Sequence, residues 1–84
     1  MKPRLRRGVR LSYDHVRQRT VVLHPEGVVM PNETALAVLE RCDGRTTAAG
    51  IAAALGEIYR GVRQQDVDAV VERMRQRGLL EMVP

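Results

Sequence analysis

Three side chains near the start of the chain have the types that a hydrolase triad uses. They are Ser12, Asp14 and His15, and they are nearly adjacent in the sequence. Alternate residues of a strand point to opposite faces, so these groups do not converge as a nucleophile, a base and an orienting acid must. We interpret them as a strand end followed by a turn. A glycine-rich phosphate-binding loop is also missing, so we expect neither an enzyme nor a bound cofactor.

Metal-ligating side chains are equally sparse. His15, His24 and Cys42 are the only histidines and cysteine, and their spacing matches no zinc-binding pattern. A free cysteine is usually buried, so we place Cys42 in a helix core. We place His24, which precedes a proline, in a turn. These residues predict no metal site.

The single cysteine excludes an internal disulfide and fits a reducing compartment. The basic residues 1–7 are not followed by the apolar segment of a signal peptide. The longest apolar run, residues 51–55, is too short to cross a membrane. We therefore expect a cytoplasmic protein that does not enter the membrane.

The positive charge is concentrated at one end of the chain. The formal net charge of the 84 residues is +4, yet residues 1–19 hold seven basic residues and one acidic residue, and residues 20–84 hold seven and nine. We expect one domain over residues 1–84, in which residues 1–7 form a flexible basic arm. Tyr13 and Tyr59 are the only aromatic residues, so no surface for stacking bases is expected.

Three short strands are predicted in the first half of the chain. Residues 9–13 alternate between apolar and polar side chains, residues 20–23 are β-branched or apolar, and residues 28–30 are apolar. A turn at His24-Pro25-Glu26-Gly27 separates the last two. Such closely spaced strands predict an antiparallel three-stranded sheet, which needs a cover on one face.

Three helices are expected to follow the sheet. Pro31 ends the third strand and Asn32 caps a helix over residues 32–42, which Gly44 closes. A second helix begins at Thr46 or Thr47, ends at Gly61 and buries residues 51, 52, 55, 58 and 59 on one face.

The third helix is predicted over residues 65–77, with residues 67, 70, 71 and 74 buried. Gly78 ends it in a Schellman motif, in which Leu79 folds back on Met74. Residues 79–83 either add a short strand or pack against the sheet. The predicted fold class is therefore α+β, a small winged-helix-like domain with a three-stranded antiparallel sheet followed by three helices.

A winged-helix DNA-binding transcriptional regulator is one function that this architecture allows. The calculated pI is about 10.2, and several residues of the third helix could face phosphates or bases: Arg63, Gln64, Arg73, Arg75, Gln76 and Arg77. A recognition helix usually meets DNA with its N-terminal residues. Here Asp66 and Asp68 occupy that end and repel phosphate. We keep DNA binding as the alternative function.

Peptide binding fits the residues better. If Val28, Val29 and Met30 lie at the edge of the sheet, their free backbone groups could pair with an extended peptide. The third helix would form the other wall of a groove, with Ala69, Val70 and Arg73 toward the peptide. A free edge of this kind can also pair two copies of the chain into a homodimer.

Four segments of the chain resemble one known family. The chain resembles the pyrroloquinoline quinone biosynthesis protein PqqD in the same order and over essentially its whole length. The segments that carry the resemblance are residues 7–11 (RGVRL), 31–35 (PNETA), 41–46 (RCDGRT) and 78–80 (GLL). Each motif is short, and the specificity comes from the ordered set. Asn32 and Asp43 in these motifs are interpreted as caps rather than as peptide contacts.

The resemblance implies a non-catalytic peptide chaperone, a recognition element for ribosomally made and modified peptides. Family members bind the precursor peptide PqqA and present it to the radical S-adenosylmethionine enzyme PqqE, which cross-links a Glu and a Tyr of the peptide. In related elements the leader peptide adds as a strand beside the third strand and lies against the third helix. This implies contacts with residues 28–30 and, along the helix, with Asp66, Ala69, Val70, Arg73 and Arg77. No nucleic acid is expected.

Overall fold

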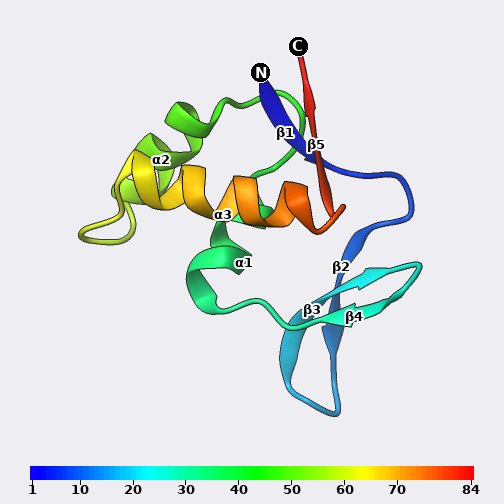
Figure 1. Ribbon diagram of the computed structural model, residues 1–84. Coiled ribbons are helices and arrows are strands. Elements are labelled where there is room, and N and C mark those ends of the chain that lie inside the picture. The colour runs from blue at the N-terminus through cyan, green and yellow to red at the C-terminus, as the bar shows by residue number, and fades with distance from the viewer.

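The computed structural model describes all 84 residues and contains two small sheets and three helices (Figure 1). In chain order the elements are β1 (Lys2–Leu5), β2 (Arg10–Asp14), β3 (Arg19–His24), β4 (Gly27–Val29), α1 (Glu33–Leu39), α2 (Ala48–Gly56), α3 (Gln64–Gln76) and β5 (Leu80–Val83). The α+β class and the three helices agree with the prediction. No helix is long and apolar enough to span a bilayer.

The predicted three-stranded sheet is present as β2-β3-β4, antiparallel throughout. Its register pairs Val22 of the central strand with Leu11 on one side and with Val29 on the other. The β3–β4 connection is the expected turn at Pro25 and Glu26. Because β3 lies between its neighbours, β2 and β4 each have one unpaired edge.

The first residues do not form the free basic arm that we expected. Lys2–Leu5 is β1, which pairs antiparallel with β5 from Lys2↔Val83 to Leu5↔Leu80. Pro3 is buried, and its carbonyl accepts a hydrogen bond from the Gly44 amide at 2.9 Å. The charged residues of this segment led to the prediction of an arm, because its strand partner, β5, is the last segment of the chain. Of the two alternatives for residues 79–83, the strand is confirmed.

One hydrophobic core joins the β2-β3-β4 sheet to the helices. Val22 and Val29 reach it from the sheet, and α3 contributes the four residues that periodicity predicted, Val67, Val70, Val71 and Met74. The remaining members come mainly from α1, α2 and the start of β5: Ala35, Ala37, Val38, Leu39, Cys42, Ile51, Ala52, Leu55, Leu79 and Leu80. The helices therefore cover the sheet face that carries Val22 and Val29.

Helix α1 begins as predicted and ends earlier. The Asn32 side chain accepts a hydrogen bond from the Ala35 amide at 2.8 Å, so Asn32 is the N-cap. The helix ends at Leu39, and Cys42 lies beyond it, buried with its thiol donating to the Val38 carbonyl. Burial raises the pKa of the Cys42 thiol to about 12. Gly44 has the expected positive φ of 77°, but it sits beside β1 and does not close the helix.

Helix α2 is also shorter than predicted. It starts after the Thr47 cap and ends at Gly56, so Ile58 and Tyr59 fall outside it. Their side chains are 60% and 48% exposed, and the prediction that they are buried on a helix face is wrong. The apolar spacing continues past the end of the helix, but the residues that follow Gly56 form turns, and so they lead to α3 without extending α2.

The end of α3 is the predicted Schellman motif. The Leu79 amide donates to the Met74 carbonyl and the Gly78 amide to the Arg75 carbonyl, both at 3.0 Å. Gly78 has φ 77°, which a side chain would disfavour. This stop directs the chain from α3 straight into β5, and it fixes where Arg77 lies.

Candidate functional site

The free edge of β4 is the first component of the site. Residues 25–31 make no backbone hydrogen bond outside the ladder with β3. The outward N–H and C=O groups of this strand are therefore unpaired within the chain, as an added strand requires. At its far end Arg19 donates to the Pro31 carbonyl at 2.6 Å, which holds the exit from β4 against the start of β3.

The side chains of β4 divide between the two faces of the sheet. Val29 is 8% exposed and belongs to the core, whereas Val28 and Met30 are 51% and 52% exposed. Val28 pairs with Leu23, and so it lies on the face opposite Val22 and the helices. If the pairing of β3 with β4 continued by one residue, Met30 would lie opposite Val21. Val21 is buried on the outer face and does not belong to the core cluster. Val28 and Met30 thus extend an apolar outer face.

Helix α3 offers two solvent-exposed flanks, and the hollows around it show which one lies toward β4. Arg77 lines a hollow together with Pro25 and Glu26 of the β3–β4 turn. Arg75 lies roughly 160° away around the helix and lines a different hollow with residues of β5. By helical spacing, Asp66, Ala69 and Arg73 lie on the same flank as Arg77, and the buried Val70 lies beside them. The C-terminal end of the Arg77 flank therefore lies on the side of the β3–β4 turn.

The opposite flank is occupied by an internal ion pair. Arg75 donates two hydrogen bonds to Glu72, at 2.9 and 2.7 Å, and Gln76 adds a third at 3.2 Å. The Arg75 hydrogen bonds hold the pKa of the Glu72 carboxyl below its usual value, and Glu72 raises the pKa of Arg75. These charges already have partners, unlike Arg73 and Arg77, which have none.

A tight turn after β1 sets the spacing between α3 and the sheet. The Arg6 amide donates to the Leu79 carbonyl at 3.0 Å, and the Val9 amide donates to the Arg6 carbonyl at 2.9 Å. Gly8, with φ 86°, would place a Cβ 3.5 Å from the Pro25 ring. Residues 6–9 thus touch the end of α3 on one side and the β3–β4 turn on the other. Sequence reasoning missed this role because it placed residues 1–7 in a free arm.

The predicted residues of β4 and α3 meet at two points, in the hollow that Arg77 shares with the β3–β4 turn and in the core that contains Val29 and Val70. In Figure 1 the connection from β4 to α1 passes below α3, whose C-terminal half lies over it. Val29 and Val70 are buried, so their side chains can form only the floor of a groove. Met30 and Arg73 were both predicted to contact the peptide. Met30 follows β4, and continuing the alternation of the strand would place its side chain on the face of Val28, away from α3.

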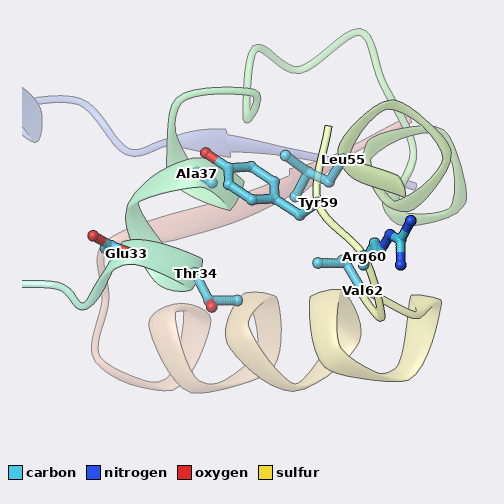
Figure 2. A pocket seen from close by; sticks show the side chains of 7 residues that line it. All are labelled: Glu33, Thr34, Ala37, Leu55, Tyr59, Arg60 and Val62. Atoms are coloured by element: carbon cyan, nitrogen blue, oxygen red, sulfur yellow. The ribbon is translucent and has the colours of Figure 1, made fainter. Parts of the chain in front are cut away.

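A third hollow lies away from β4, between the helices. It has a volume of about 190 Å³ and is lined by Glu33, Thr34, Ala37, Leu55, Tyr59, Arg60 and Val62. Figure 2 shows the Tyr59 ring reaching across from the end of α2 toward Ala37 of α1, while Arg60 points away. This hollow has no free strand edge, so it does not suit an extended peptide.

The residues that suggested catalysis or metal binding have structural roles. Asp14 accepts hydrogen bonds from the Val16 and Arg17 amides at 2.9 and 3.0 Å and from the Arg17 guanidinium, which lower the pKa of its carboxyl. The interpretation as a strand end and turn is confirmed. His15 packs edge-on against Tyr13, with ring centroids 5.0 Å apart. No group of three metal-ligating side chains comes together.

Comparison with known proteins places the chain in a family. The family model described as coenzyme PQQ synthesis protein D (PqqD) matches residues 19–80. The chain belongs to the PqqD family. A relative from Rhodopseudomonas palustris named PqqA binding protein is 39% identical over 94% of this chain and 80% of its own length. A Klebsiella pneumoniae protein of the same name is 43% identical over 77% of this chain and 71% of its own length.

Two solved structures share the fold of this PqqD family member. One is the PqqD part of Methylobacterium extorquens PqqCD, which is 38% identical to this chain. It is described as a functional and stand-alone recognition element for ribosomally synthesized and post-translationally modified peptides. The two structures superpose with a TM-score of 0.71 over 94% of this chain and 87% of that one. Lasso peptide synthetase B1 complexed with its leader peptide superposes with a TM-score of 0.78 over the full length of both chains, at 22% identity. The second likeness concerns the fold alone.

Proposed function

We propose that this chain is a non-catalytic peptide chaperone of pyrroloquinoline quinone biosynthesis that binds the precursor peptide PqqA. The observation that carries the proposal is the unpaired edge of β4 beside the exposed Arg77 flank of α3, in a chain whose relatives are named for PqqA binding. The absence of a convergent set of catalytic or metal-ligating side chains is compatible with this role.

In the proposed complex the peptide adds to β4 as a further strand. Its backbone pairs with the outward groups of residues 28–30, which supplies affinity independent of sequence. Successive peptide side chains then point to opposite faces. Those on the helix side meet Ala69, Val70 and Arg73 of α3, and those on the other side meet the exposed Val28 and Met30. Two different surfaces thus read alternate residues of the peptide.

We further propose that the bound peptide is handed to the radical S-adenosylmethionine enzyme PqqE. The peptide would occupy the β4 edge and leave the hollow between α1 and α2 uncovered. Co-purification of PqqE with this chain, compared with and without PqqA, tests the partnership. Equal recovery of PqqE with an unrelated small domain would argue against it.

The direct test of the proposed function is calorimetric. Titration of the PqqA peptide encoded in the same genome into this chain should give saturable one-to-one binding, and a random DNA duplex at low salt should give no heat. Binding of DNA that weakens steeply with salt, together with no heat from PqqA, would favour the regulator alternative. Sedimentation of the free chain at the same concentrations reports whether the β4 edge pairs two copies.

A further inference from the structure

An unpaired cluster of arginines lies at one end of the proposed peptide groove. The hollow there has a volume of about 250 Å³ and is lined by Arg6, Arg7, Val9, Pro25, Glu26, Arg77 and Gly78. It therefore joins the turn after β1, the turn before β4 and the last residues of α3. Three arginines thus line one hollow on the side of the molecule where β4 begins.

These three arginines have no acidic partner within the chain. The ion pairs of the protein are Arg4–Glu81, Arg17–Asp14, His24–Glu26 and Arg75–Glu72, so Arg6, Arg7 and Arg77 form none. None of the three donates a side-chain hydrogen bond to another residue. Glu26 is the one acid in the lining, and its carboxylate lies 3.3 Å from the His24 ring. The cluster thus retains an excess positive charge.

The positions of these side chains are set by the backbone. The Arg6 amide donates to the carbonyl of Leu79, in the stop after α3, and a Cβ at Gly78 would lie 3.8 Å from the Arg6 guanidinium nitrogen. Arg77 is the C-cap of α3, where a cation also compensates the helix dipole. The positive charges are therefore held at the point where an added strand would pass the β3–β4 turn.

We propose that this cluster binds an acidic side chain of the peptide and so fixes the register of the peptide along β4. The proposal rests on the proposed function, because the occupant is the same peptide. Backbone pairing alone would allow the peptide to slip along the strand, and an arginine–carboxylate contact at one end removes that freedom. The group that binds is a side-chain carboxylate of the peptide. It belongs to the end of the added strand that lies beside Pro25 and Arg77.

The test combines charge reversal in the protein with charge reversal in the peptide. Arg7→Glu and Arg77→Glu are each titrated with synthetic PqqA and with PqqA peptides in which one acidic residue at a time is replaced by lysine. Arg45→Glu is the matched control, because Arg45 is exposed, has no ion pair and lines none of the hollows. Thermal melts of each variant verify that the fold is retained.

We expect each reversal in the cluster to weaken PqqA binding by roughly five- to tenfold at low salt, with a smaller loss at high salt, and Arg45→Glu to leave it unchanged. One lysine-substituted peptide should bind the reversed variants better than it binds the parent, which would identify the partnered acid. If the parent binds PqqA and the cluster variants bind it equally well, the register proposal is wrong while the proposed function stands. If the parent binds no PqqA, the proposed function itself fails.

Discussion

The substitution Met30→Asp probes the outer side of the proposed peptide strand. Met30 is 52% exposed in the free chain, so a bound peptide can bury only this exposed half of its surface. Complete burial of a methionine side chain contributes about 1.5–3 kcal/mol, so its exposed half contributes about 1 kcal/mol to binding. A carboxylate placed against apolar peptide side chains adds a desolvation cost of about 1 kcal/mol or more.

The two contributions predict a loss of about 2 kcal/mol for Met30→Asp, which is roughly a 30-fold increase in the Kd for PqqA. Isothermal titration calorimetry measures this change directly. The melting temperature of the free variant should stay close to that of the parent, because the side chain is outside the core.

Ile58→Asp is the matched control for this experiment. Ile58 is a large apolar residue that is 60% exposed, but it follows α2 and lies away from β4. We expect Ile58→Asp to bind PqqA as the parent does. If Met30→Asp keeps the parental Kd, or if Ile58→Asp loses affinity to the same extent, the peptide does not lie along β4.

Three further substitutions and one chemical reaction test other parts of the structure. Val29→Ala removes two methyl groups from the core side of β4 and should lower the free energy of unfolding by about 2 kcal/mol, measured by urea denaturation; an unchanged midpoint would contradict its placement in the core. Gly78→Ala forces a side chain into a φ of 77° and should cost about 1–2 kcal/mol in the same assay, and a neutral result would argue against the Schellman stop. Tyr59→Ala alters the hollow between α1 and α2 and should leave PqqA affinity unchanged, whereas a large loss would move the peptide to that hollow. The Cys42 thiol, whose pKa burial raises to about 12, should react with iodoacetamide at pH 8 far more slowly in the folded chain than in urea, and equal rates would show that it is exposed.

The local signals of the sequence were sufficient for most elements. Asn32 and Thr47 cap the helices that were assigned to them, and Gly78 and Leu79 form the expected stop after α3. Each of these signals acts within a few residues, so no knowledge of tertiary contacts was required. The same is true of the turn at Pro25, which separates two strands that pair directly.

The elements that were missed depend on contacts between distant parts of the chain. β1 has a short pattern in which Pro3 and Leu5 alternate with charged residues, and only pairing with β5 makes it a strand. Ile58 continued the apolar period of α2, but nothing in that period showed that the helix stops at Gly56.

The candidate site shows the same division. Periodicity predicted the buried stripe of α3, and so it also predicted that Arg73 and Arg77 lie on an exposed side of the helix; that the peptide binds there stays a prediction. Periodicity could not show which sheet face Val28 occupies, because that depends on its pairing with Leu23. Periodicity also could not predict that Arg6 lies next to Gly78, because these residues come from opposite ends of the chain.

The most direct test of strand addition at β4 is amide hydrogen exchange, followed by NMR with and without PqqA. The proposed complex predicts that outward-facing amides among residues 28–30 exchange rapidly in the free chain and become protected when PqqA is bound, while the other free edge, residues 10–14 of β2, is unchanged. Protection confined to β2, or to the residues around Tyr59, would contradict strand addition at β4.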